Sequence, residues 1–231
     1  MLLHRLKSIF RRFWLRRHGV NPEITCARLD LGVANGTWTV SPDNLNAQSI
    51  VYSFGIGTDI SFDLALISMF QAVVHAFDPT PRAKGWIQSQ SLPANFVYHD
   101  YGIAGYDGLM KFYPPKRAQS PHFTPVLRYK HGAATSFVSV PVRTLKTLMN
   151  MLGHDHLDLL KLDIEGGEYD VIENILADRI PIRQLLVEFH HNYRTIPLHR
   201  TVRALRCLRD AGYRIFNISR RTLEFSLLRA D

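Results

Sequence analysis

One short apolar run constrains the fold of this chain more than any other stretch. It reads Leu157-Asp-Leu-Leu-Lys-Leu-Asp-Ile-Glu-Gly-Gly-Glu168, and an amphipathic helical pattern follows at once. The run is too short for a typical helix, and its length fits a buried strand. Two glycines then permit a tight turn, and Glu168 falls in the first turn of the next helix, where negative charge complements the helix dipole.

Two acids therefore stand at the carboxyl end of this strand. Asp163 and Glu165 flank its last apolar residue, Ile164, before the glycines begin. Ligands bind at this edge of an open α/β sheet, so we interpret both as site residues. The alternative is that they only end a strand and cap a helix, but two acids with two glycines exceed what a cap requires.

The rest of the chain alternates between strand and helix patterns. Strands are expected at 49–54, 73–77, 95–99, 157–163 and 182–189, and helices at 59–70, 82–90, 142–152, 168–177 and 197–211. This alternation predicts βαβ units around a parallel sheet. A final hairpin is expected from strands at 213–218 and 222–228. Residues 19–48 look irregular, and 106–140 predict short antiparallel strands or a loop over the sheet.

A glycine pair follows the first strand of this pattern. Gly55 and Gly57 precede a helix whose free N–H groups suit a ligand, although an ordinary turn is the alternative. Asp78 ends the next strand, where an acid binds ribose hydroxyls in dinucleotide folds. Position 60 is Ile60, so the G-x-G-x-x-G pattern is incomplete. The set favours a smaller adenosine ligand over a nicotinamide dinucleotide.

Most of the positive charge lies at the start of the chain. Residues 1–18 hold six Lys and Arg and no acid, so +6 of the net +8 is local and a nucleic-acid-binding body is disfavoured. Apolar residues at helical spacing accompany these charges, which is typical of an amphipathic helix on an anionic membrane surface. Packing on the domain itself is the alternative. No signal peptide or membrane-spanning run is predicted.

Cysteine usage excludes two kinds of site. Cys26 and Cys207 are far apart, so neither a zinc cluster nor a disulfide framework is indicated. A reduced, cytoplasmic location is the expectation, with peripheral membrane association through residues 1–18. A metal held by Asp163, Glu188 and His190 is conceivable, but the ligand spacing gives it no separate support, and no metal is assigned. The sequence indicates no oligomeric state.

The residues of 159–168 resemble the FkbM methyltransferases, a branch of the class I enzymes that use S-adenosylmethionine. Val51 to Asp59, His75 to Pro79 and Leu186 to His190 extend the resemblance, which spans roughly 35–228. It implies an α/β, Rossmann-like, mostly parallel seven-stranded sheet with an antiparallel C-terminal strand. We divide the chain into a basic segment (1–18), an extension (19–48) and the methyltransferase domain (49–231).

The resemblance also assigns the donor site. Residues at the ends of the first three strands would hold S-adenosylmethionine: Ser53, Gly55, Gly57, Asp59, Asp78, Asp100 and Gly102. Many class I enzymes carry an acid where this chain has Ser53, so the contact to the methionine amine is weaker or comes from another acid, with Asp59 a candidate.

Methyl transfer to a hydroxyl needs positioning and removal of a proton. We assign these tasks to four residues near the acidic run: Asp163, Glu165, Glu188 and His190. The ordinary pKa of histidine makes His190 the most suitable base. The expected function is O-methylation of a saccharide, glycolipid or polysaccharide. The alternatives are methylation of a polyketide or peptide hydroxyl, and a non-catalytic membrane-docked binding protein with this fold.

Overall fold

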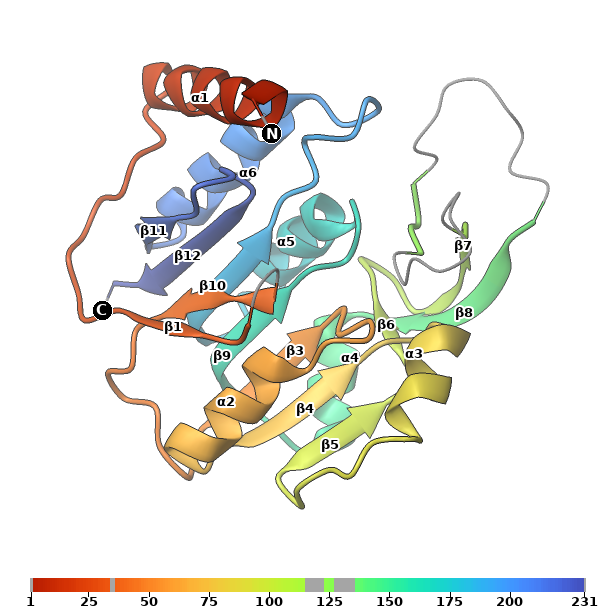
Figure 1. The fold of residues 1–231 in the computed structure, drawn as a ribbon. Helices are drawn as coiled ribbons and strands as arrows, with labels where there is room; N and C mark the ends of the chain where they lie inside the picture. Colours follow the sequence, from red (N-terminus) through yellow and green to blue (C-terminus); the bar gives the residue numbers. More distant parts are fainter. Residues whose placement is uncertain (1, 34–35, 115–122, 127–135, 231) are drawn as a thin grey trace.

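The computed structural model describes residues 2–33, 36–114, 123–126 and 136–230 (Figure 1). Its centre is a sheet of seven strands: β3 (Ile50–Phe54), β4 (Val73–Phe77), β5 (Phe96–His99), β9 (Leu157–Leu162), β10 (Ile182–Glu188), β11 (Tyr213–Ile218) and β12 (Glu224–Arg229). Their order across the sheet is β11-β12-β10-β9-β3-β4-β5. Only β12 runs against its neighbours within this sheet. The expected α/β fold with an antiparallel C-terminal strand is confirmed.

Helices cover both faces of this sheet. The helices are α1 (Leu2–Arg17), α2 (Ser61–Phe70), α3 (Pro81–Ile87), α4 (Leu145–Leu152), α5 (Glu168–Ala177) and α6 (Leu198–Asp210). Strand side chains alternate between faces, so Val51 packs in one core with α2 and α3, while Tyr52 packs in the other with α4, α5 and α6. Both faces of β3 and β9 are buried, which explains their nearly continuous apolar sequence.

The segment between α1 and β3 is more ordered than its sequence suggests. It forms an antiparallel hairpin of β1 (Leu29–Leu31) and β2 (Trp38–Val40). Trp38 and Val40 are buried in the core with α2. The side chain of Gln184 bonds both backbone groups of Ser41, at 2.7 and 3.2 Å. Strands of three residues are too short to produce a readable alternation, so the irregular appearance of 19–48 hid this hairpin.

A small second sheet interrupts the βα alternation. It contains β6 (Gly102–Ile103), β7 (Gly108–Phe112) and β8 (Val138–Arg143), in the order β6-β8-β7. The antiparallel pairing of β7 with β8 agrees with the expectation for 106–140, whereas the parallel pairing of β6 with β8 was not foreseen. Residues 115–122 and 127–135 of that range lie outside the described residues.

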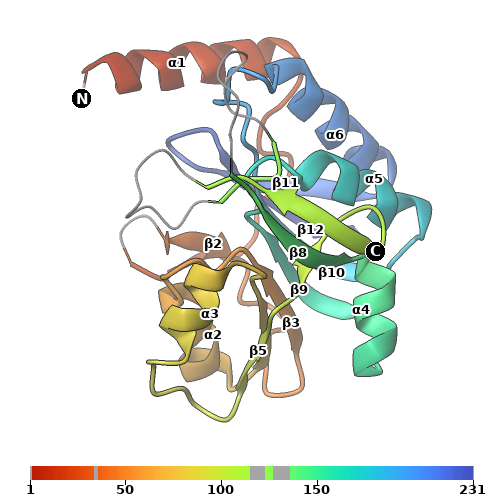
Figure 2. The same cartoon turned by 90° about the vertical axis from the view of Figure 1, so that its right-hand side faces the viewer.

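Helix α1 packs across the end of the sheet that carries β11 and β12. Its C-terminal half is anchored by the buried Leu15, and Arg12 donates to the carbonyl of Ser219 at 2.9 Å. In Figure 2 the N-terminal end of α1 projects beyond the rest of the molecule. Among the described residues, no helix combines the length and the apolar character that crossing a bilayer requires.

Candidate active site

A cavity of about 990 Å³ opens at the carboxyl ends of β3, β4 and β9. Residues of β7 and of 123–126 also line it. Seven of the residues assigned to a site from sequence line this cavity: Gly55, Gly57, Asp59, Asp78, Gly102, Asp163 and Glu165. Four of them do not belong to its lining: Ser53, Asp100, Glu188 and His190.

The glycine turn after β3 brings two strand ends into contact. Gly55 has a φ of +78°, and a Cβ atom there would lie 1.7 Å from the backbone oxygen of Asp163. The Asp163 N–H donates to the carbonyl of Phe54 at 3.2 Å. Only glycine permits this approach, which carries the turn past the acidic end of β9.

Asp78 holds the same turn from the neighbouring strand. One carboxylate oxygen accepts from the N–H of Gly57 at 2.9 Å. The other accepts from the N–H and the hydroxyl of Thr80, at 2.9 and 2.6 Å. Burial raises the pKa of Asp78, and these hydrogen bonds oppose the rise. Asp78 therefore fixes the geometry of the glycine turn besides lining the cavity.

A buried lysine lies beneath the turn. Lys161 Nζ lies 3.3 Å from the carbonyl oxygens of both Phe54 and Gly55, and 5.2 Å from the ring centre of Trp38. The side chain belongs to β9 and is almost fully buried. Its charge opposes the rise in pKa that burial causes at Asp78 and Asp163. Lys161 thus supplies the positive charge that keeps several buried acids close together.

Asp63 is an acid that the sequence reasoning missed. It lies in the first turn of α2, is 1% exposed and lines the cavity. Its Oδ1 and the hydroxyl of Ser53 are buried without a hydrogen-bond partner among the described residues. Burial raises the pKa of Asp63, while Lys161 and then Ser53 lower it, so the three groups lie close together. Asp63 thus places a carboxylate beside Ser53.

The acidic turn after β9 is tied to the helix that follows. Glu168 is fully buried, and its Oε1 accepts from the N–H groups of Ile164 and Gly166, at 3.3 and 3.0 Å. Glu165 adopts a φ of +54°, a conformation that costs on the order of 1 kcal/mol outside glycine. Such strain occurs at functional sites. The side chain of Glu165 accepts a hydrogen bond from the Tyr193 hydroxyl.

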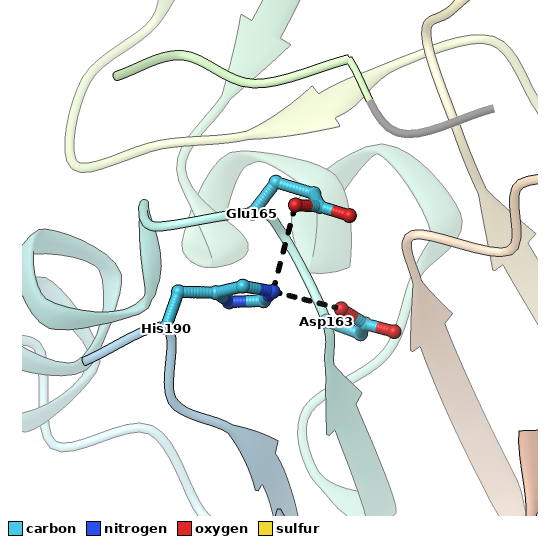
Figure 3. Close-up of side chains that lie close together, drawn as sticks. All are labelled: Asp163, Glu165 and His190. Atoms are coloured by element: carbon cyan, nitrogen blue, oxygen red, sulfur yellow. Dashed lines mark ion pairs between the residues drawn. The ribbon is translucent and has the colours of Figure 1, made fainter. Parts of the chain in front are cut away.

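His190 faces this acidic turn from the end of β10 (Figure 3). Its Nε2 lies 3.8 Å from Asp163 Oδ1 and 3.6 Å from Glu165 Oε2, and its Nδ1 lies 2.8 Å from Glu168 Oε1. Burial alone would lower the pKa of His190, but the three carboxylates together raise it to about 10. The imidazole is therefore protonated near neutral pH, unlike the neutral base that its ordinary pKa suggests.

Three other residues assigned from sequence each have a partner outside the acidic turn. Asp100 forms an exposed ion pair with Lys84 at 2.7 Å. Asp59 accepts from the N–H of Ser61 at 2.9 Å, close to the start of α2. Glu188 pairs with Arg221 at 3.1 Å, and burial followed by the charge of Asp163 raises the pKa of Glu188 to about 8.

Sequence signals existed for some of the missed residues. Lys161 is a charge inside an apolar strand, which is costly unless paired. Asp63 resembled an ordinary first-turn acid of a helix, and nothing local showed that it faces inward. The contact of Tyr193 with Glu165 depends on the chain path after β10, which no local pattern encodes.

Comparison with known proteins identifies the family. The model of the methyltransferase FkbM domain matches residues 49–215. The probable methyltransferase-like protein 24 of Homo sapiens is 29% identical over 147 residues, covering 63% of this chain and 33% of that protein. Its Rattus norvegicus counterpart is 28% identical over 185 residues, covering 73% and 44%. The chain thus spans less than half the length of these relatives.

Two solved structures are also similar in part. The FkbM methyltransferase from Methylobacillus flagellatus KT gives a TM-score of 0.49 at 14% identity, over 79% of this chain and 44% of that one. Aeropyrum pernix fibrillarin with bound S-adenosyl-L-methionine gives 0.44 at 11% identity, over 89% and 83%. The family match covers most of this chain, and it agrees with the acidic run and the glycine turn described above. The chain belongs to the methyltransferase FkbM family.

Proposed function

We propose that this protein transfers a methyl group from S-adenosylmethionine to a hydroxyl of a saccharide, glycolipid or polysaccharide. The observation that carries the proposal is the acidic turn, which presents Asp163 and Glu165 to the same cavity as the glycine turn. One side of the cavity thus suits a nucleoside ligand, and the other suits a group that must lose a proton.

The residues of the glycine turn fit the donor. Gly55 leaves no room for a side chain, so the backbone itself lines that part of the cavity. The buried Asp63 has an oxygen without a partner among the described residues, and this carboxylate suits the amine of the methionine moiety. Asp63 would then take the place of the acid that is absent at Ser53.

When bound, S-adenosylmethionine supplies an electrophilic methyl carbon, and its sulfur keeps the electron pair of the broken C–S bond. The acceptor oxygen forms the new C–O bond, and its proton passes to Asp163 or Glu165. Burial raises the pKa of Asp163, which makes it a better proton acceptor. His190 is a positioning residue here, because its proton faces both carboxylates and holds them at the cavity wall.

The part of the cavity lined by β7 and its neighbouring residues favours a sugar-like acceptor. It combines aromatic and polar side chains, including Tyr106, Phe112, Tyr113 and Phe123. Flat aromatic faces beside a few polar groups are typical of sites that orient a small ligand. A hydroxyl of a polyketide or peptide is the competing acceptor, and the acceptor screen below separates it from a saccharide hydroxyl.

An acceptor screen with Asp163→Asn tests the proposal. The full chain is incubated with methyl-labelled donor and with glycolipids, polysaccharides or small-molecule alcohols. We expect Asp163→Asn to lower kcat by about 100-fold or more while the donor Kd stays within about threefold. Asp170→Asn is the control, because Asp170 lines the same cavity but pairs with Arg200. Equal losses of turnover and donor affinity would assign Asp163 to the donor instead.

We further propose that α1 holds the protein at an anionic membrane surface on the cytoplasmic side. Ile9, Phe10 and Phe13 are 65%, 69% and 59% exposed on this helix. Lys7, Arg16 and Arg17 are exposed beside them, and α1 carries no acid. Apolar side chains flanked by cations suit the boundary between acyl chains and anionic headgroups.

Vesicle co-sedimentation tests this docking. Phe10→Ser with Phe13→Ser should abolish binding to vesicles that contain anionic lipid, since the apolar anchor is lost. Phe137→Ser is the matched control, because Phe137 is 47% exposed but lies outside α1. Binding by the double variant at the level of the control, or equal binding to neutral vesicles, would contradict membrane docking through α1.

A further inference from the structure

Three potential metal ligands converge at the cavity edge. Asp163 and Glu165 extend from the turn after β9, and His190 follows β10. One ligand atom from each lies within 4.8 Å of the other two. Figure 3 shows the imidazole Nε2 pointing between the two carboxylates. Segments that are about 25 residues apart in the chain thus present one nitrogen and two oxygens to a single point.

The orientation of the His190 ring is fixed by a contact at its other nitrogen, Nδ1. Its Nδ1 lies 2.8 Å from the carboxylate of Glu168, which is itself fully buried. His190 is 4% exposed, so its ring has little freedom to turn away. Metal-binding histidines almost always direct their second nitrogen to such a carboxylate or carbonyl, which fixes the tautomer and the ring orientation. Glu168 supplies this partner.

The distances within the cluster suit ligands around an ion better than direct hydrogen bonds. His190 Nε2 lies 3.8 Å from Asp163 and 3.6 Å from Glu165, which is beyond the usual hydrogen-bond range. Ligands at about 2.1 Å from one ion are about 3 to 3.5 Å apart. The three ligand atoms, which lie within 4.8 Å of one another, would therefore draw closer together to form the first coordination shell.

We propose that Asp163, Glu165 and His190 bind a first-row divalent transition ion, with Mn²⁺ as the probe of that class. Carboxylates with an imidazole suit such ions, whereas Mg²⁺ and Ca²⁺ prefer sites made only of oxygen. Asp163 and Glu165 line the cavity, so open coordination positions face it. There the ion would lower the pKa of the bound acceptor hydroxyl, and the carboxylate oxygen of Asp163 or Glu165 that does not bind the ion would take the proton, a role that rests on the proposed function.

The proton of His190 and the ion compete for the same place. The three neighbouring carboxylates favour the protonated ring of His190, which is then itself a cation beside Asp163 and Glu165. A metal-binding histidine must give up that proton. The experiment therefore has to separate a true metal site from an ion pair that His190 completes by itself.

Mn²⁺ binding to the full chain, stripped beforehand with a chelator, is measured by electron paramagnetic resonance. We expect one ion per chain, and about tenfold or greater loss of affinity in both His190→Gln and Asp163→Asn. Glu173→Gln is the matched control, because Glu173 lines the cavity outside the cluster and should leave Mn²⁺ affinity unchanged. Circular dichroism and donor binding confirm that each variant is folded.

Two results would overturn the metal site. One is the lack of saturable Mn²⁺ binding below about 1 mM. The other is equal affinity in the cluster variants and in Glu173→Gln. Methyl transfer with and without Mn²⁺ separates this proposal from the proposed function. Equal transfer after chelation overturns the role of the ion but keeps the methyltransferase. Bound Mn²⁺ without transfer to any acceptor class keeps the site and overturns the proposed function.

Discussion

Replacement of Glu168 by Gln should destabilise the fold well beyond the effect of losing one surface charge. The variant keeps the size and one acceptor oxygen of the side chain but removes its negative charge. Glu168 is fully buried and accepts from two backbone N–H groups of the acidic turn. It also faces the Nδ1 of His190 at 2.8 Å. The substitution therefore weakens three interactions at a site that water does not reach.

The magnitude follows from these contacts. A hydrogen bond to a charged group contributes about 1 kcal/mol more than a neutral one, and breaking a buried ion pair costs about 3 to 5 kcal/mol. Because the amide retains one acceptor, we expect the free energy of unfolding to fall by about 3 kcal/mol. For a chain of 231 residues this corresponds to a decrease in Tm of about 6 °C.

Thermal unfolding followed by circular dichroism measures this change. Glu173→Gln lies on the same helix with its side chain 62% exposed, so it should change stability by less than about 0.5 kcal/mol. If Glu168→Gln lowers the free energy of unfolding by less than about 1 kcal/mol, the buried charge is not what holds the acidic turn. Equal losses of stability in Glu168→Gln and Glu173→Gln would lead to the same conclusion.

Three further outcomes can be measured directly. Gly55→Ala places a methyl group 1.7 Å from the backbone oxygen of Asp163. Donor binding measured by calorimetry should therefore weaken by about 100-fold. A donor Kd within about threefold of the wild-type value would contradict the role assigned to this turn. Asp63→Asn should raise the donor Kd about tenfold with the fold intact, and an unchanged Kd would exclude Asp63 from the amine site. Burial, with the charges of His99 and His154, lowers the pKa of His75 to about 4, so its contribution to stability is complete above about pH 6.5 and is lost as the pH falls towards 4. Urea unfolding at pH 7 and 4.5 should therefore show a smaller decrease in the free energy of unfolding for His75→Leu than for the wild type. Equal decreases would refute the lowered pKa of His75.

The sequence predicts the scaffold of the site because that scaffold obeys local rules. The run 157–168 combines a buried strand, a glycine turn and a helix start, and each has its own residue preference. The same holds for the glycine pair after β3. In parallel sheets these strand ends share one edge, so topology brings Gly55 and Asp163 together once the strands are recognised.

The remaining details depend on contacts between distant segments. Asp63 faces the cavity only because of the way α2 packs on the sheet, and the pKa of His190 depends on three carboxylates that meet it in space. The parallel pairing of β6 with β8 joins residues about 40 positions apart, through strands as short as two residues. Neither orientation nor pairing of this kind leaves a periodic signal in the sequence.

The hairpin of β1 and β2 has a practical consequence for anyone who prepares this protein in fragments. The family match begins at residue 49, so an expression fragment trimmed to that boundary would lack Trp38 and Val40. The amide side chain of Gln184 would lose both of its partners on Ser41 and remain in a newly exposed apolar surface. Such a fragment would lack part of the core around α2, and insolubility after trimming would say nothing about the enzyme itself.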